Sequence, residues 1–86
     1  MASEETTMTR LWFSPAGIER ARRESFAGIT AEQRVRDGWE VELKTCSLEW
    51  LSRWLLSFGK DAVALAPAKL RMLVRAEALA IAKRHG

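Results

Sequence analysis

Apolar and polar residues follow two different periods along the chain, and these periods predict its strands and helices. Alternation with a period of two, which is typical of a half-buried strand, runs through 9–13 and is clearest in 39–45. Positions 31–35 form a more polar strand that suits the edge of a sheet. Residues 62–66 are short and apolar, and we expect them to form a buried strand.

Apolar residues at helical spacing predict three helices. They cover residues 15–27, 48–58 and 67–83. Ser14 is a good N-cap with Pro15 in the first helical position, and Ser47 has the same capping role before the second helix. Gly59 suits a left-handed residue at the end of that second helix, and Pro67 opens the third.

The clearest turn lies between the second and third predicted strands, at 36–38. A two-residue turn at Asp37 and Gly38 would place two arginines on the core face of the sheet. A three-residue loop with Gly38 in a left-handed conformation would pair Val35 with Trp39, which keeps apolar residues together. We therefore favour the longer loop.

The predicted order is strand, helix, strand, strand, helix, strand, followed by an extra helix. The first six elements form the split β-α-β-β-α-β pattern of an α+β, ferredoxin-like fold. Such a sheet is antiparallel, with both helices on one face and the other face open. We expect one domain over residues 9–86 and a disordered leader over residues 1–8, which are polar, acidic and small.

Composition narrows the classes of function. Fourteen Lys and Arg residues against eleven Asp and Glu give a net charge of +3. A dedicated nucleic-acid binder usually has a denser cluster of basic residues than this chain. Cys46 is the single cysteine and His85 the single histidine, so a disulfide framework, a multi-cysteine metal site and a histidine-based triad are excluded. We expect no enzymatic activity, no metal and no cofactor. No apolar run approaches the roughly 20 residues of a membrane span, and we expect a cytoplasmic protein.

The run 48–71 carries a resemblance to a known family. Residues 54–59 read W-L-L-S-F-G, and the run continues with further matching positions at Ala62, Leu65, Pro67, Leu70 and Arg71. This pattern resembles the C-terminal extension (WCX) domain of bacterial WYL-domain transcription regulators, over about residues 9 to 83. The resemblance implies a parent protein with a winged-helix DNA-binding domain and a WYL domain, neither of which matches a segment of this chain. Core packing explains the apolar residues at helical spacing within this run, so the motif predicts a fold and not a chemical activity.

Trp12 is the most informative single residue. Alternation places its side chain on the face without helices, in a central strand and beside Glu40, Glu42 or Lys44. A large aromatic residue at such a position indicates a covered surface. It could be a base-stacking platform, which the two glutamates disfavour, or an interface with another domain or subunit, or a lone exposed tryptophan covered by an arginine.

The candidate interface or ligand-binding residues are Arg10, Trp12, Arg34, Arg36, Lys44 and Arg71. The arginines could form an anion site around the tryptophan, or they could pair with cross-strand glutamates. The favoured hairpin register pairs Arg34 with Glu40. We interpret Arg20 and Arg22 as a solvated helix face.

Two functions of different class follow from these observations. The first is a regulatory domain that couples the WYL domain to oligomer geometry or forms part of an effector pocket with it. Its partners would be the WYL and winged-helix domains of the parent chain, a second copy in a homodimer and a small-molecule effector. The alternative is binding of single-stranded nucleic acid or a nucleotide by the sheet, with a steep salt dependence.

Overall fold

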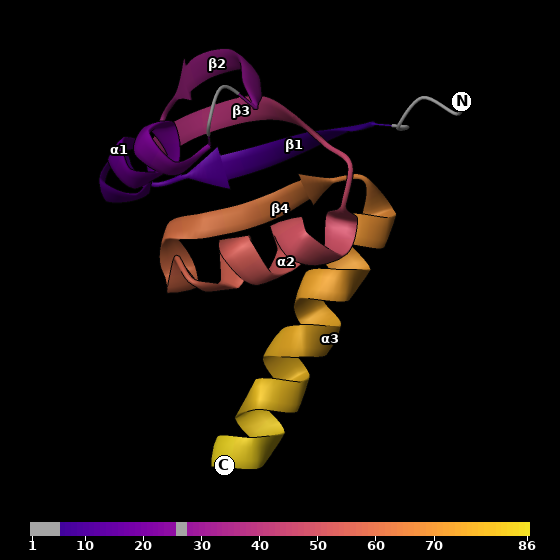
Figure 1. Cartoon of the computed structure of the whole chain (residues 1–86). Coiled ribbons are helices and arrows are strands. Elements are labelled where there is room, and N and C mark those ends of the chain that lie inside the picture. The colour runs from indigo at the N-terminus through magenta and orange to yellow at the C-terminus, as the bar shows by residue number, and fades with distance from the viewer. Residues whose placement is uncertain (1–5, 26–27) are drawn as a thin grey trace, which may run out of the picture.

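The computed structural model describes residues 6–25 and 28–86, and it has an α+β architecture (Figure 1). Its elements are β1 (Thr7–Phe13), α1 (Pro15–Glu24), β2 (Ile29–Val35), β3 (Gly38–Thr45), α2 (Leu48–Leu56), the 3-10 turn η1 (Gly59–Asp61), β4 (Ala62–Ala66) and α3 (Ala68–His85). The four strands form one sheet in the order β2-β3-β1-β4, and every neighbouring pair is antiparallel. The element order and the central position of β1 and β3 confirm the prediction.

The first strand begins earlier than predicted. Thr7 and Met8 were assigned to a disordered leader, but they pair with Thr45 and Lys44 of β3. Their inclusion follows from the length of β3, which offers two further backbone partners at its end. The rest of the predicted leader, residues 1–5, lies outside the described residues.

The helix caps follow the sequence closely. The Ser14 hydroxyl accepts from the Gly17 backbone N–H at 3.0 Å and donates to a carboxylate oxygen of Asp61 at 2.8 Å. The Ser47 hydroxyl accepts from the Trp50 N–H at 3.0 Å. Both caps satisfy amide groups that have no partner within the helix. Gly59 has φ of 61° and follows α2 as predicted.

One hydrophobic core fills the space between the sheet and α1 and α2. Its fully or almost fully buried members are Leu11, Phe13, Ile18, Ala21, Val41, Leu43, Leu51, Leu55, Phe58, Ala64 and Leu70. The inward positions of β1 and β3 alternate with outward ones, as the period of two requires. Because residues of both α1 and α2 join the same cluster as the inward residues, these two helices cover one face of the sheet.

Neither predicted register of the hairpin is correct. The turn consists of Arg36 and Asp37, and Val35 pairs with Gly38. This pairing places Arg34 opposite Trp39, on the face that the helices cover. The predicted pairing of apolar with apolar residues across this turn is therefore wrong.

The reason for this register lies beneath the ring of Trp12. A Cβ atom on Gly38 would lie 2.3 Å from the Phe13 carbonyl oxygen and 2.7 Å from Trp12 Nε1. A glycine is therefore required here by close approach, and the left-handed conformation that we predicted for Gly38 is not adopted. The length of this turn is therefore set by packing against residues far away in the sequence, and not by the residues of the turn alone.

The strand β4 has the predicted bounds but is not buried. It forms one edge of the sheet, and its inward position is taken by the small residue Ala64, which is 8% exposed. Val63 is 45% exposed and, with Leu65, lies on the open face. The apolar run therefore predicts a strand correctly, but the larger residues face away from the helices.

The last helix is only partly packed. Leu70 is fully buried, and α3 packs against α2 and β4 near its first turns. Beyond Val74 the helix projects from the rest of the domain, with its C-terminus far from the sheet (Figure 1). Ile81, in this projecting part, is 48% exposed.

Candidate functional site

The face of the sheet opposite α1 and α2 is the largest candidate surface, and we call it the open face. Alternation brings outward residues of the strands together on it. They are Met8, Arg10 and Trp12 of β1, Glu40, Glu42 and Lys44 of β3, and Val63 and Leu65 of β4. The open face therefore mixes an aromatic ring, aliphatic side chains and charges of both signs.

Trp12 lies at the centre of this surface, as predicted. Its cross-strand neighbours are Glu40 on β3 and Val63 on β4. The indole Nε1 donates a hydrogen bond to Oδ1 of Asp37 at 3.2 Å, and the same edge of the ring lies over Gly38. These contacts hold the half-buried ring in one orientation, which is a property of residues that serve as rigid anchors in interfaces.

A shallow groove runs beside Trp12. Its volume is about 510 Å³, and its lining consists of Trp12, Val35, Arg36, Asp37, Glu40, Val63 and Leu65. Four of these side chains are apolar, and the charged Arg36 and Asp37 belong to the hairpin turn. Such a groove suits an apolar side chain or loop of another protein surface.

Charges on the open face are balanced. Three cations and three anions lie on the face or at its rim, namely Arg10, Arg36 and Lys44 against Asp37, Glu40 and Glu42. Arg10 Nη2 lies 4.0 Å from Glu42 Oε2, so at least one cation is matched by a cross-strand neighbour. Both side chains are about half exposed, and a pair of this kind contributes only about 0–1 kcal/mol.

Two of the six candidate residues lie elsewhere. Arg34 does not pair with Glu40, because the hairpin register turns it to the helix-covered side, where its guanidinium lies 5.9 Å from the Trp39 ring centroid. Arg71 lies on α3, where it lines a separate groove of about 500 Å³ between that helix and β4. The structure therefore unites Arg10, Trp12, Arg36 and Lys44 on one face and separates the other two from it.

The hairpin register also determines which residues of β2 meet α1. Because Val35 pairs with Gly38, Glu32 pairs with Val41 and lies on the helix-covered side. A bulge between Ile29 and Ala31 then places Ile29 opposite Leu43, on the same side. Arg22 of α1 binds Glu32 there, with Nη2 and Oε1 2.8 Å apart, and lies 4.8 Å from the Trp39 ring centroid. Hydrogen bonding to the carboxylate raises the pKa of the Arg22 guanidinium. Arg22 is exposed, as predicted, but its guanidinium is paired with a carboxylate of the neighbouring strand.

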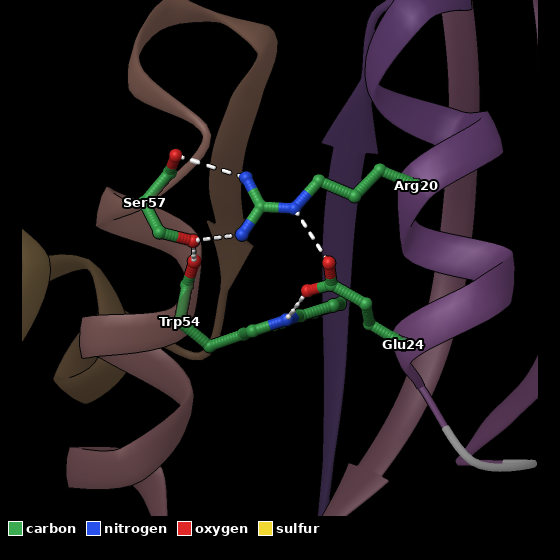
Figure 2. A network of polar contacts seen from close by, with 4 residues as sticks. All are labelled: Arg20, Glu24, Trp54 and Ser57. Carbon is green, nitrogen blue, oxygen red and sulfur yellow. Dashed lines mark hydrogen bonds and ion pairs between the residues drawn. The ribbon is translucent and has the colours of Figure 1, made fainter.

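A second polar network joins α1 to the end of α2, as Figure 2 shows. Arg20 Nε donates to Glu24 Oε2 at 2.9 Å, and its Nη1 and Nη2 donate to the carbonyl and hydroxyl of Ser57 at 3.0 and 2.7 Å. Trp54 Nε1 donates to the other oxygen of Glu24 at 3.0 Å. These bonds fix α1 against a carbonyl at the end of α2 that the helix itself cannot pair.

This network gives the motif at 54–59 a physical role. Trp54 and Ser57 supply polar partners to α1, while Phe58 lies under the Arg20 guanidinium at 4.1 Å and packs against the Phe13 ring at 5.2 Å. The motif therefore organises the junction of two helices with the core. It was predicted as a mark of the fold, and its contacts agree with that interpretation.

Arg20 and Glu24 are the residues of this network that the sequence interpretation missed. The hydrogen bonds from Arg20 and then from Trp54 lower the pKa of the Glu24 carboxyl. Their spacing of four residues on one helix was a usable signal for an ion pair. Nothing local, however, indicated that the same guanidinium would reach Ser57, which lies 37 positions away.

The part of the chain that the structure describes offers neither a metal-binding cluster nor a membrane-spanning helix. No group of three or more His, Cys, Asp or Glu side chains there is arranged to hold a metal ion. Within residues 6–25 and 28–86, no helix combines the length and apolar character needed to cross a membrane.

A protein-family model matches most of the chain. The family model described as the WCX domain matches residues 5–82, which is almost the whole chain. No curated protein matches the sequence. The matched span includes both the open face and the helix junction of Figure 2.

Proposed function

The chain belongs to the WCX-domain family, and from this premise we propose that it is the regulatory C-terminal extension domain of a WYL-type transcription regulator. The resemblance of residues 48–71 to such extensions supports this context. We further assign the fold to the ferredoxin-like type, because the sheet order β2-β3-β1-β4 with antiparallel neighbours is the order expected for a split β-α-β-β-α-β unit. The proposed role is regulatory rather than enzymatic.

We infer that the open face docks against the WYL domain of the same regulator. The observation that carries this inference is Trp12, a half-buried aromatic ring held by Asp37 at the centre of an otherwise uncovered sheet face. Tryptophan is among the residues that contribute most to binding energy in protein interfaces. Val63 and Leu65 extend the apolar surface beside the ring, and charged residues form its rim.

The charge pattern favours a protein partner over a nucleic acid. Binding to a polyanion requires cations that are free to replace counterions at phosphates. Here Glu40 is the direct cross-strand neighbour of Trp12, and Glu42 is the neighbour of Arg10. A stacked base would therefore bring its phosphate toward carboxylates, whereas a protein surface can match both signs.

The test compares the same substitution, tryptophan to alanine, at a position on the open face and at a position away from it. Trp12→Ala in the isolated extension domain should weaken its binding to the isolated WYL domain at least about tenfold, measured by titration. Trp50→Ala is the matched control, because Trp50 is 52% exposed on α2, away from the open face. Effector response should fall with Trp12→Ala and persist with Trp50→Ala.

Two results would count against this role. Unchanged domain affinity and unchanged effector response in the Trp12→Ala regulator would remove the open face from the regulatory contact. Quenching of tryptophan fluorescence by single-stranded oligonucleotide, with a steep loss at higher salt, would favour the alternative of nucleic-acid binding.

A further inference from the structure

One side of α3 is packed against the rest of the domain only in the first turns of the helix. Residues at the same helical spacing continue this side into the part of the helix that is not packed. Leu70, Leu73 and Val74 face α2 and β4, and Leu70 is fully buried. The same side of the helix is continued by residues at positions 77, 80, 81 and 84, which follow at helical spacing. Figure 1 shows that this part of α3 extends beyond the sheet and α2.

We call Glu77, Ala80, Ile81 and Arg84 the overhanging face. Ile81 is 48% exposed at its centre, and Glu77 and Arg84 stand at its two ends. None of the ion pairs found among the described residues involves either end residue. The face is thus a continuation of an internal packing surface, with an apolar centre, a negative end and a positive end.

We propose that the overhanging face binds the same face of a second copy of the chain, with the two α3 helices antiparallel about a two-fold axis. An axis between positions 80 and 81 places Ala80 of one copy against Ile81 of the other. It also places Glu77 of each copy opposite Arg84 of the other, and the symmetry makes this charge pair twice. The small side chain of Ala80 leaves room for the larger Ile81.

The direction of the pairing follows from the charges. A parallel arrangement would bring Glu77 beside Glu77 and Arg84 beside Arg84, and like charges at such positions repel. Antiparallel pairing replaces both repulsions with attractions. The contact involves only the outer turns of one helix, which is less than the roughly 800 Å² per partner of a standard interface, so the dimer is weak and concentration-dependent.

This inference is independent of the role proposed for the open face, because α3 projects away from the sheet. It also assigns a specific partner to the projecting helix. If both charges of the overhanging face are reversed, a different protein surface would meet two mismatched charges. A second copy carries the same reversal, so its charges still match. That property makes the proposal testable with the chain itself.

The experiment measures molar mass by light scattering across a wide range of concentration. The unchanged chain should rise from 9.7 kDa toward twice that value. Glu77→Arg alone, or Arg84→Glu alone, places like charges opposite each other twice and should weaken the dimer about tenfold. Lys83→Glu is the matched control, because it makes the same change of charge one position away and off the overhanging face.

Mixing the two variants gives the sharpest result. The Glu77→Arg chain and the Arg84→Glu chain are each self-repelling, yet together they restore two opposite-charge pairs, so a mixed dimer should form. The double variant Glu77→Arg/Arg84→Glu should also dimerise like the unchanged chain. Circular dichroism of each variant checks that α3 remains helical.

Three outcomes would overturn the proposal. The first is a mass that stays at 9.7 kDa at every concentration. The second is a dimer that neither single reversal weakens, and the third is a weakened pair of variants that fails to form a mixed dimer. A dimer lost in Trp12→Ala but kept in Glu77→Arg would place self-association on the open face instead, so the two proposals fail separately.

Discussion

The two faces of the sheet are built from alternate residues of the same strands, but they are organised by different interactions. On the helix-covered face, Phe13 is fully buried and contacts the rings of Trp54 and Phe58. On the open face its neighbour Trp12 is half-buried and held through its edge by Asp37. Burial therefore determines the first face, whereas the second keeps an apolar surface that no other part of the described residues 6–25 and 28–86 covers.

The central part of the family motif, residues 54–59, belongs to the first face. Trp54, Ser57 and Phe58 connect α2 to α1 and to the core, and Gly59 allows the chain to turn toward β4. None of them reaches the open face. A motif can thus identify a fold very well while the surface available for function lies on the opposite side of the sheet.

The largest expected effect tests this contrast at two adjacent positions. Phe13→Ala should lower the free energy of unfolding by about 3–5 kcal/mol, because it leaves a cavity among packed rings. Trp12→Ala should cost only about 1 kcal/mol, since the ring loses one hydrogen bond and partial burial. Urea denaturation followed by circular dichroism measures both, and Phe13→Leu keeps the comparison accessible if the alanine variant does not fold. Similar losses at the two positions would break the contrast.

A smaller effect is expected at the one closely packed point of the open face. Gly38→Ala should destabilise the fold by about 1–3 kcal/mol, because the new Cβ meets the Phe13 carbonyl and forces β1 and β3 apart. Adding Trp12→Ala should not restore the loss, since the carbonyl is backbone. Gly59→Ala is the comparison: its Cβ would meet open space, so the cost of about 1–2 kcal/mol comes from its φ of 61° alone.

The smallest expected effect is on the pH dependence of the helix junction. Arg20 and Trp54 lower the pKa of Glu24 in the folded state, so this carboxylate contributes stability above its ordinary pKa of 4.5 and loses that contribution as pH falls through the folded value. Glu24→Gln should therefore flatten the decline in thermal stability between about pH 5 and pH 3. Glu49→Gln, at an exposed carboxylate of α2, is the control. An unchanged decline in Glu24→Gln would show that the network does not depend on the charge.

Much of the fold could be predicted because its signals are local. The caps at Ser14 and Ser47, the left-handed Gly59 and the bounds of β4 all follow from residues within a few positions of each other. The hairpin register could not be predicted in the same way. It depends on Trp12, which lies 26 positions before Gly38 in the sequence and above it in the sheet.

The candidate site was predicted in part. Alternation correctly placed Trp12 on the open face, because the period of two is independent of register within a strand. It left Glu40, Glu42 and Lys44 as possible neighbours, and the structure pairs Trp12 with Glu40. Arg34 was assigned to the wrong side because a change of one residue in the turn reverses the face of the β2 residues between the turn and the bulge at Ala31. The site residues of the central strand were therefore predictable, whereas those of the edge strand were not.

The order of elements, the starts of the first two helices and the family are properties that the amino-acid sequence determines by itself, since each rests on short-range patterns. Three features were decided only by the tertiary structure. They are the turn at Arg36 and Asp37, the exposure of Val63 on an edge strand, and the bonds from Arg20 to Ser57. Each depends on contact between residues far apart in the chain, and such contacts exist only once the sheet and helices have packed together.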